Sequence, residues 1–360
     1  MRDKNSHETI LVTGGAGFIG SHTLLSLIED GYTPIIIDNL QNGNLIILDI
    51  VEKIVDIKPK FYEGDIRDKI LLKKIFNENK IDAVIHFAGL KSVQDSVANP
   101  QLYYENNVIG TSILLDEMKE AGVRRFIFSS SATVYGEPNY LPIDEEHSRC
   151  VTNPYGDTKL KIEDILISLS ENYPKWSISI LRYFNPIGAH NSGLIGEDPK
   201  NKPQNLMPFL TNVALGNIKE LKIYGNDYPT PDGTGIRDYI HVMDLAEGHL
   251  AALSHNKTNF GINFFNLGTG EGTSVLELLK MFEEVNKVKI PYSFVERRPG
   301  DVFSSFSDVN KAKKILNWEA KKNIKLMCED SWRWQTKNPN GYDKKYHAVD
   351  ETYNQIWFKD

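Results

Sequence analysis

The chain has 360 residues, of which 41% are hydrophobic and 25% are charged, and its formal net charge is −7 at pH 7. This composition is typical of globular proteins and excludes disordered and collagen-like chains. The negative charge argues against nonspecific nucleic-acid binding. The length predicts either one large domain with a lobe or two unequal domains.

Two cysteines, Cys150 and Cys328, are too few for a disulfide framework or a four-ligand zinc site, so we expect no metal. The first nine residues, MRDKNSHET, are polar, and the sequence contains no run of 18 apolar residues. These features favour a soluble protein in the reducing environment of the cytoplasm.

Short β-rich runs alternate with amphipathic helical segments in the first half of the chain. The runs cover residues 9–14, 34–39, 60–65, 83–89, 125–132 and 178–185. Near-continuous apolar runs are typical of parallel strands that are buried between helices. The pattern predicts a Rossmann-type, doubly wound α/β sheet within residues 1–185. A long helix over about 100–121 is indicated by Asn99 as cap, Pro100 at its first position and Gly122 after its end.

After residue 185 the pattern loosens into loops that are rich in glycine, proline and asparagine. Helical segments recur near residues 206–216, 242–254, 273–286 and 308–316. Long loops inside a compact enzyme are usually functional. We expect residues 186–345 to form a smaller mixed α/β lobe that binds the substrate over the carboxyl edge of the sheet. Residues 346–360 form a tail without an assigned role.

A glycine-rich turn, VTGGAGFIGSH, follows the first predicted strand. Gly14, Gly17 and Gly20 allow a tight turn, a close approach to a pyrophosphate and close packing of the next helix, whose N-terminus attracts the anion. Asp38 ends the second strand, where a carboxylate binds ribose hydroxyls and repels a 2′-phosphate. The turn and the acid together predict a dinucleotide site that prefers NAD to NADP.

Two further polar residues follow strands at the same predicted edge of the sheet. Asp65 in GDIRD lies near the expected adenine position, although it could equally cap a turn or helix. Lys91 in FAGLK is either a ligand contact at the edge where α/β proteins bind ligands or a solvated lysine.

The stretch NPYGDTKL places Tyr155 and Lys159 on one face of a predicted helix. Lowering the pKa of a phenol from about 10 to about 7 takes roughly 4 kcal/mol. One positive charge at about 5 Å supplies on the order of 3 kcal/mol, so lysine together with a cationic nicotinamide is sufficient. Ser131, the last serine of SSSATVYG, follows the fifth strand, where its hydroxyl could share a proton with the tyrosine. Asn106 is either a polar anchor behind this site or an exposed amide.

In combination, these motifs resemble the extended short-chain dehydrogenase/reductase family, and within it the enzymes that epimerise UDP-hexoses at C4. The resemblance runs from about Ile10 to about Tyr342. It includes VTGGAGFIGSH, EGDIRD, VIHFAGLKSV, YYENNVIGT, FIFSSSATVYG, NPYGDTKL, LRYFNPIGAH, NLMPFL, YGNDYPTPDGTGIRDYIHVMDLA and RRPGD. It implies that Tyr155 takes the proton of the 4-hydroxyl while a hydride passes from C4 to NAD. Ser131 would lie in the proton path and Lys159 would hold the cofactor ribose, while the 4-keto sugar turns and receives the hydride on its other face.

The resemblance also assigns binding residues by position. For NAD they are Gly14, Gly17, Phe18, Ile19, Gly20, Asp38, Asn39, Asp65, Ile66, Phe87, Ala88, Gly89, Lys91, Asn106, Tyr155, Lys159 and Phe184. For the UDP-hexose they are Lys91, Ser131, Tyr155, Asn185, Asn205, Leu206, Tyr224, Arg237, Arg298, Asp301 and Ser305. The residue types fit, because arginine forks suit a diphosphate, tyrosine offers a stacking face and an acid accepts ribose hydroxyls. Relatives in this family pair through two helices, which predicts a homodimer through about 100–121 and 154–171.

The chain departs from the family pattern in three places. Asp157 and Thr158 stand where the family commonly has lysine and serine, and Asp157 should face away from the tyrosine. The spacing from Ser131 to Tyr155 is one residue shorter than usual, a difference that a loop must absorb. Ser305 stands where some members carry a bulky tyrosine, and a small residue there implies acceptance of N-acetylated hexoses such as UDP-GlcNAc and UDP-GalNAc.

Other functions remain open at the level of sequence. A nucleotide-sugar 4,6-dehydratase needs an acid pair after the fifth strand, where this chain has Ala132 and Thr133. A UDP-glucuronate epimerase or decarboxylase and a noncatalytic NAD-binding sensor are the alternatives, and the intact Ser131, Tyr155 and Lys159 count against the sensor.

Overall fold

A parallel sheet of seven strands forms the centre of the computed structural model, which describes residues 8–200, 203, 205–298 and 300–342. The strand order is β10-β6-β5-β4-β1-β2-β3, and every neighbouring pair is parallel. The strands are β1 (Thr9–Thr13), β2 (Thr33–Asp38), β3 (Lys60–Glu63), β4 (Ala83–His86), β5 (Arg125–Ser131), β6 (Ser177–Tyr183) and β10 (Gly261–Leu267). The direction of winding reverses between β1 and β4, which is where ligands bind in doubly wound sheets. The predicted fold class and the six predicted strands are therefore confirmed.

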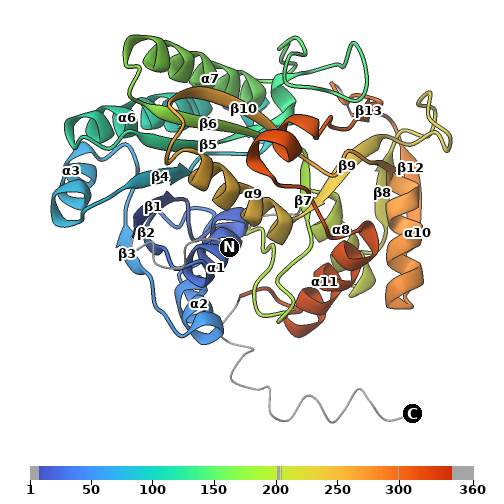
Figure 1. The fold of residues 1–360 in the computed structure, drawn as a ribbon. Helices are drawn as coiled ribbons and strands as arrows, with labels where there is room; N and C mark the ends of the chain where they lie inside the picture. The colour runs from blue at the N-terminus through green and yellow to red at the C-terminus, as the bar shows by residue number, and fades with distance from the viewer. Residues whose placement is uncertain (1–7, 201–202, 204, 299, 343–360) are drawn as a thin grey trace.

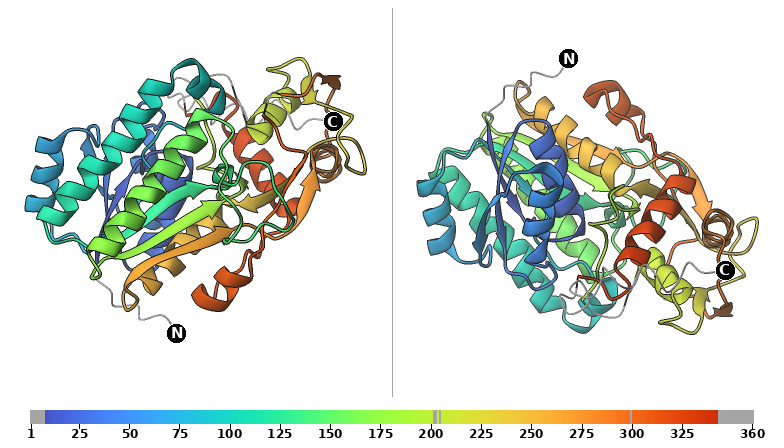
Figure 2. Two further views of the ribbon diagram at one scale, coloured as in Figure 1. Left: turned by 90° about the horizontal axis from the view of Figure 1, so that it is seen from above. Right: turned by 90° about the horizontal axis from the view of Figure 1, so that it is seen from below.

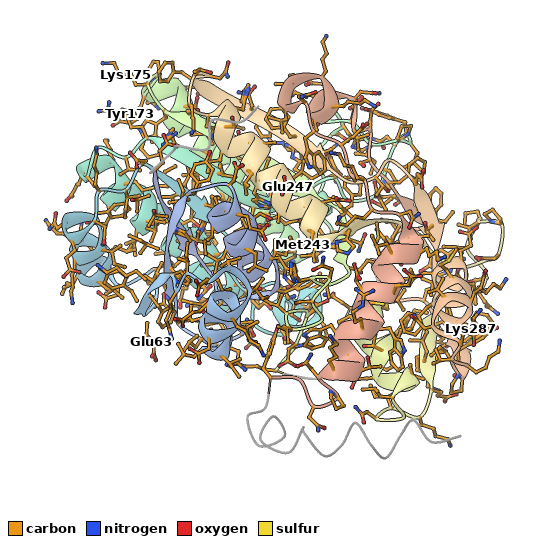
Figure 3. The ribbon with its side chains drawn as sticks, turned by 60° about the horizontal axis from the view of Figure 1, so that its bottom comes forward. Glu63, Tyr173, Lys175, Met243, Glu247 and Lys287 are labelled. Atoms are coloured by element: carbon orange, nitrogen blue, oxygen red, sulfur yellow. The ribbon has the colours of Figure 1, made fainter. Side chains whose placement is uncertain are left out.

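Helices cover both faces of this sheet (Figures 1 and 2). One face packs against α1 (Phe18–Glu29), α2 (Ile46–Val55) and α9 (Val242–His255), and the other against α3 (Lys69–Glu78), α6 (Gly110–Glu120) and α7 (Pro154–Asn172). Side chains of β1 alternate between the two cores, with Ile10 and Val12 on the first face and Leu11 on the second. This two-sided burial explains why the strands read as continuous apolar runs. Figure 3 labels Met243 and Glu247 on α9.

The second half of the chain builds a smaller lobe around its own apolar core, which includes Leu210, Phe282 and Cys328. Its helices are α8 (Leu206–Ala214), α10 (Val275–Asn286) and α11 (Ile324–Lys337). Its strands are β7 (Asn185–Ile187), β8 (Leu221–Tyr224), β9 (Ile236–His241), β11 (Gly272–Ser274), β12 (Tyr292–Val295) and β13 (Ser304–Ser305). Figure 1 shows this lobe beside the ends of the central strands.

The chain returns to the first domain after it has entered the smaller lobe. Helix α9 packs on α1, and β10 pairs with β6 at the edge of the central sheet. A division at residue 185 does not account for this return, because α9 and β10 both lie within 186–345. The sequence analysis did not predict β10, since GINFFNL lies among loops and is partly exposed at the sheet edge. The tail over residues 346–360 lies outside the described residues.

The predicted helix over about 100–121 is a continuous helical stretch with three segments. These are α5 (Pro100–Tyr103), the π-helical η1 (Tyr104–Ile109) and α6, and α4 (Val93–Ala98) precedes them. Pro100 takes the first position and Gly122 follows the end with φ +74°, as predicted. Asn99 precedes the helix but makes no capping bond through its side chain, because its backbone is not extended (φ −136°, ψ 61°).

Two short helical turns complete the described elements. They are η2 (Ala132–Val134), directly after β5, and the π-helical η3 (Ala312–Leu316). None of the described helices combines the length and the apolar character that a bilayer crossing requires.

Candidate active site

The start of α7 sets the positions of the tyrosine and the lysine. Asn153 caps the helix, since its Oδ1 accepts a hydrogen bond from Gly156 N at 2.8 Å, and Pro154 occupies the first turn. Tyr155 therefore lies in the first turn and Lys159 one turn later, on the side that faces the end of β5. Lys159 is 6% exposed, while Tyr155 keeps part of its side chain accessible.

Hydrogen bonds join this helix to the end of β5. The side chain of Ser131 interacts with the Tyr155 hydroxyl and acts to lower its pKa. Lys159 Nζ donates to the carbonyl oxygen of Ser129 at 2.7 Å and lies 5.9 Å from the centre of the Tyr155 ring. The structure thus brings the three predicted catalytic residues together where α7 begins beside the end of β5.

The electrostatics of the pair differ from the sequence-based expectation. Burial raises the pKa of Tyr155 to about 12, although the hydrogen bond from Ser131 acts in the opposite direction. Burial also lowers the pKa of Lys159 to about 8, and the charge of Glu163 opposes this shift. The expected lowering of the tyrosine pKa by lysine is not found, because desolvation of the phenol is the largest effect and raises the pKa.

The departures from the family pattern are accommodated locally. Asp157 is partly exposed and forms an ion pair with Lys161 at 3.5 Å, so it faces away from the site as expected. Thr158 is buried, and its Oγ1 donates to Tyr155 O at 2.7 Å. The same Oγ1 accepts a bond from Asn107 Nδ2 at 3.1 Å, which ties α7 to η1.

The glycine turn fits a dinucleotide. Gly14 has φ +70°, and a Cβ on Gly20 would lie 2.4 Å from Gly14 O, so neither position accommodates a side chain without movement. Gly17 is the N-cap of α1 and provides no capping side chain, which leaves the first N–H groups of the helix available to an anion. Phe18 and Ile19 begin the same helix.

The acid after β2 supports the turn as well as offering oxygens to a ribose. Asp38 Oδ2 accepts a bond from Ala16 N at 3.0 Å, and Oδ1 accepts one from Leu40 N at 2.8 Å. Burial raises the pKa of Asp38 while these two bonds oppose the shift. These residues fit NAD, because the glycine turn combines a close backbone approach with a free helix N-terminus, and the Asp38 carboxylate is bonded to the same turn.

The other predicted cofactor residues lie along the carboxyl ends of the strands. Asn39 Nδ2 donates to Asp65 Oδ2 at 3.1 Å, and hydrogen bonds from Arg67 lower the pKa of Asp65 to about 2. Ile66 follows this acid and is buried. The remaining positions are Phe87, Ala88 and Gly89 after β4, the buried Asn106 in η1 and the buried Phe184 after β6.

A carboxylate that the sequence analysis did not select joins Lys91 to Asn205. Glu197 Oε1 accepts bonds from Lys91 Nζ at 3.2 Å and from Asn205 Nδ2 at 2.9 Å. Lys91 follows β4, and Asn205 is the N-cap of α8 in the smaller lobe. This link brings a predicted cofactor residue and a predicted substrate residue to one point.

The predicted nucleotide-binding residues form two pairs in the smaller lobe. The Arg298 guanidinium lies 3.9 Å from the centre of the Tyr224 ring, and Arg237 is bonded to Asp301. Ser305 lies opposite Arg237 in the parallel pair of β13 with β9, so the two side chains project to the same side. The other two positions, Asn185 and Leu206, begin β7 and α8.

Sequence reasoning missed several polar residues that support the site. The side-chain amide of Asn107 accepts a bond from Leu90 N and donates one to Leu90 O. Glu163 and Arg182 form a buried ion pair. The Tyr183 hydroxyl donates to Ser129 Oγ. One signal was available, since Glu163 follows Lys159 by four residues and thus lies on the same helical face. The other partners come from distant segments.

Comparisons with known proteins agree with this geometry. A family model described as GDP-mannose 4,6 dehydratase matches residues 11–331. The UDP-glucose 4-epimerase of Bacillus subtilis is 54% identical, over 92% of this chain and 98% of the relative. The UDP-glucose 4-epimerase of Dictyostelium discoideum is 53% identical, over 93% of this chain and 98% of the relative.

Solved structures extend the comparison to three dimensions. The UDP-glucose 4-epimerase of Bifidobacterium longum, in complex with NAD+ and UDP, has a TM-score of 0.90 and 52% identity, covering 93% of this chain and 100% of that one. The UDP-Glc/GlcNAc 4-epimerase of Campylobacter jejuni has a TM-score of 0.80 and 36% identity, covering 92% and 99%. The chain belongs to the UDP-glucose 4-epimerase family, within the extended short-chain dehydrogenases/reductases.

Proposed function

We propose that this protein interconverts UDP-glucose and UDP-galactose by inverting C4 of the hexose, with NAD as a bound cofactor. The observation that carries the proposal is Tyr155 with Lys159 and Ser131 beside it, at the carboxyl edge of a sheet whose glycine turn fits a dinucleotide. The family membership supports the same reaction.

The protein's own residues move and hold the proton of the 4-hydroxyl. Tyr155 is the base, and Ser131, which interacts with its hydroxyl, shares the proton as the sugar oxygen approaches. Lys159 is fixed by the Ser129 carbonyl, so its positive charge stays beside the tyrosine ring and stabilises the phenolate. NAD, held at the glycine turn and Asp38, would supply the acceptor and donor of a hydride for C4 of the sugar.

Binding is divided between the two parts of the chain. Residues 1–185 hold NAD at the glycine turn, Asp38 and Lys159, while residues 186–345 hold the UDP moiety. Arg237 and Asp301 bond each other in the structure, and with substrate bound Arg237 contacts the diphosphate while Asp301 contacts the uridine ribose. Arg298 moves from the Tyr224 ring to a phosphate. Arginine suits this change of partner because its planar guanidinium binds carboxylate and phosphate alike.

We infer that the sugar site also accepts an N-acetyl group. Ser305 projects to the same side as Arg237 and has a small side chain in the place where a tyrosine would crowd the sugar. The relative from Campylobacter jejuni is described as a UDP-Glc/GlcNAc 4-epimerase, which supports activity on both classes of substrate. We therefore include UDP-GlcNAc and UDP-GalNAc among the substrates.

The working unit is a homodimer in the cytoplasm. Apolar side chains are exposed along α4, α5 and η1, with Val97 64%, Leu102 45%, Tyr104 43% and Ile109 42% exposed. This row lies beside α7, so it coincides with the helices at 100–121 and 154–171 that were expected to pair.

The free thiols of Cys150 and Cys328 fit the reducing compartment.

Product analysis tests the proposed function. The purified protein is incubated separately with UDP-glucose, UDP-GlcNAc and UDP-glucuronate, and the sugars are separated while absorbance at the NADH band is followed. We expect UDP-galactose and UDP-GalNAc without accumulation of free NADH. Stoichiometric NADH would identify a dehydrogenase instead, and conversion of UDP-glucuronate alone would assign a different UDP-sugar enzyme.

A further inference from the structure

A buried carboxylate lies on the same helix as the proposed base. Glu163 is 0% exposed and follows Lys159 by one helical turn and Tyr155 by two. Ser130 Oγ donates to its Oε1 at 2.6 Å. Arg182 donates to both of its oxygens, through Nε at 3.0 Å and Nη2 at 2.7 Å, and Arg149 Nη1 from the loop before α7 donates to Oε2 at 3.4 Å. The proton-transfer steps described above do not use this group.

Glu163, Ser130 and Arg182 lie on three different elements and meet at one point along the sheet. Ser130 on β5 and Arg182 on β6 are directly opposite each other in the sheet, and Glu163 on α7 bonds to both. The next pair in the same register is Ser131 with Tyr183. Glu163 therefore connects the helix of Tyr155 to the sheet position that immediately precedes Ser131.

Stability alone does not explain such a group. A buried ion pair is expensive to desolvate, and apolar residues of similar volume often replace one without loss of stability. This arrangement fixes α7 relative to β5 and β6, because one carboxylate on the helix bonds side chains of both strands.

Glu163 also influences the charge of Lys159. Burial lowers the pKa of Lys159 to about 8, and the negative charge of Glu163 opposes that shift. The titratable and charged groups around Lys159 are Tyr155 and Glu163 on α7, His86 on β4, and Arg182 and Tyr183 on β6. Burial keeps His86 and Tyr183 neutral, and Arg182 is bonded to Glu163. Glu163 is thus the nearby anion that favours the ammonium form.

We propose that Glu163 is a positioning residue, which acts through Ser130 to hold Ser131 against Tyr155 and through its charge to keep Lys159 cationic. The proposal rests on the function proposed above, because it assigns Glu163 to the support of that proton path. Glu163 makes no contact with the substrate in this role.

Three variants separate positioning from general stability. Glu163→Gln keeps the shape but removes the charge, and Ser130→Ala removes one hydrogen bond while retaining the pair of Glu163 with Arg182. Asp164→Asn is the matched control, since Asp164 is 56% exposed and bonds Arg149 at 3.0 Å, the same arginine that lies 3.4 Å from Glu163. The change removes an acid beside Glu163 and leaves the bonds of Glu163 to Ser130 and Arg182 in place. Each variant is assayed with UDP-glucose from pH 6 to pH 10, and melting temperatures are recorded.

The expected results differ between the variants. In Glu163→Gln the alkaline limb of the pH profile of kcat/KM moves to lower pH by about one unit. The lost negative charge lowers the Lys159 pKa, and a tenfold change in the ratio of ammonium to amine corresponds to one pH unit. In Ser130→Ala kcat falls about tenfold while KM stays within about twofold and the limb does not move, since the charge remains. Asp164→Asn behaves as wild type. Lower melting temperatures with unchanged pH profiles and kcat would overturn the proposal.

A direct titration distinguishes this proposal from the function on which it rests. Chain labelled with 13C-lysine is titrated by NMR without substrate, and the Lys159 signal is assigned by its loss in Lys159→Met. We expect the Lys159 pKa to fall by about one unit in Glu163→Gln relative to wild type. An unchanged pKa contradicts the proposal even if the enzyme epimerises UDP-glucose. If Glu163→Gln does not fold, the kcat of Ser130→Ala decides the question.

Discussion

At the scale of single residues, the site depends on a tyrosine that is a poor base before its ligands bind. Burial raises the pKa of Tyr155 to about 12, and Lys159 alone does not reverse this. The additional positive charge expected from the oxidised cofactor is therefore required for activity near neutral pH. Catalysis is thereby confined to the loaded site.

Replacing the base tests this directly. In Tyr155→Phe we expect kcat to fall by about 10²- to 10⁴-fold, which is the usual contribution of a positioned acid or base, with NAD content unchanged. Tyr140→Phe is the control, because Tyr140 is 47% exposed and bonds only the nearby Asp144 in its loop. A Tyr155→Phe enzyme with full activity would remove the tyrosine from the mechanism.

Buried histidines make the fold sensitive to acid. His86 bonds Thr13 Oγ1 at 2.6 Å and Thr111 Oγ1 at 2.8 Å, and burial lowers its pKa to about 3. In the unfolded chain the pKa is about 6.5, so below that pH the unfolded state binds more protons. The contribution of His86 to stability is therefore complete above about pH 6.5 and is lost as the pH falls toward 3.

Denaturant unfolding at two pH values measures this contribution. Between pH 8 and pH 5, wild type should lose about 2 kcal/mol more of its free energy of unfolding than His86→Gln. The variant will be less stable at pH 8, since the imidazole bonds are lost, so the comparison concerns the change with pH. Equal losses in the two proteins would show that His86 is not the acid-sensitive group.

At the scale of elements, most of the fold was predictable because its signals are local. The six strands of the first half, the glycine turn and the start of α7 each depend on residues that are close in the sequence. The strand β10 and helix α11 were missed, because their burial depends on β6 and α10, which lie far along the chain.

The site was predictable to the same extent. Tyr155 and Lys159 were found through their helical spacing, and Ser131 through its place after a strand. Glu197 was not, because its bonds to Lys91 and Asn205 cross between the two parts of the molecule. Tyr155 also shows the limit for electrostatics, since desolvation depends on packing that sequence spacing does not contain.

The glycine turn offers a graded test at this scale. A Cβ on Gly20 would lie 2.4 Å from Gly14 O, whereas one on Gly17 would lie 3.3 Å from the same atom. Gly20→Ala should therefore displace the start of α1 and lower the free energy of unfolding by about 1–3 kcal/mol, which is the usual cost of overpacking. Gly17→Ala should lose less stability, because its Cβ meets no atom closer than 3.3 Å. Denaturant unfolding measures both variants, and equal losses of stability would contradict the steric explanation.

At the scale of the whole molecule, the exposed row on α4, α5 and η1 is the surface that we propose for dimerisation. Leu102→Asp combined with Ile109→Asp places two charges in the proposed interface and should shift the sedimentation of a dimer to that of a monomer at micromolar concentration. Ile70→Asp is the control, since Ile70 is 84% exposed on α3, away from this row. A wild-type monomer, or a dimer that survives the double change, would refute the interface.

The whole molecule also combines two half-sites, one for NAD and one for the UDP-sugar, around a single carbon atom. The account requires that the hydrogen removed from C4 returns to C4, because the same bound cofactor serves both directions. If C4 were instead inverted by loss of its proton to water, the returning hydrogen would come from the solvent.

The most direct measurement uses UDP-glucose that carries deuterium at C4, incubated with the protein in ordinary water. Mass spectrometry and NMR of the product then locate the label. The account predicts UDP-galactose that retains deuterium at C4. UDP-galactose without the label, or the absence of UDP-galactose, would contradict it.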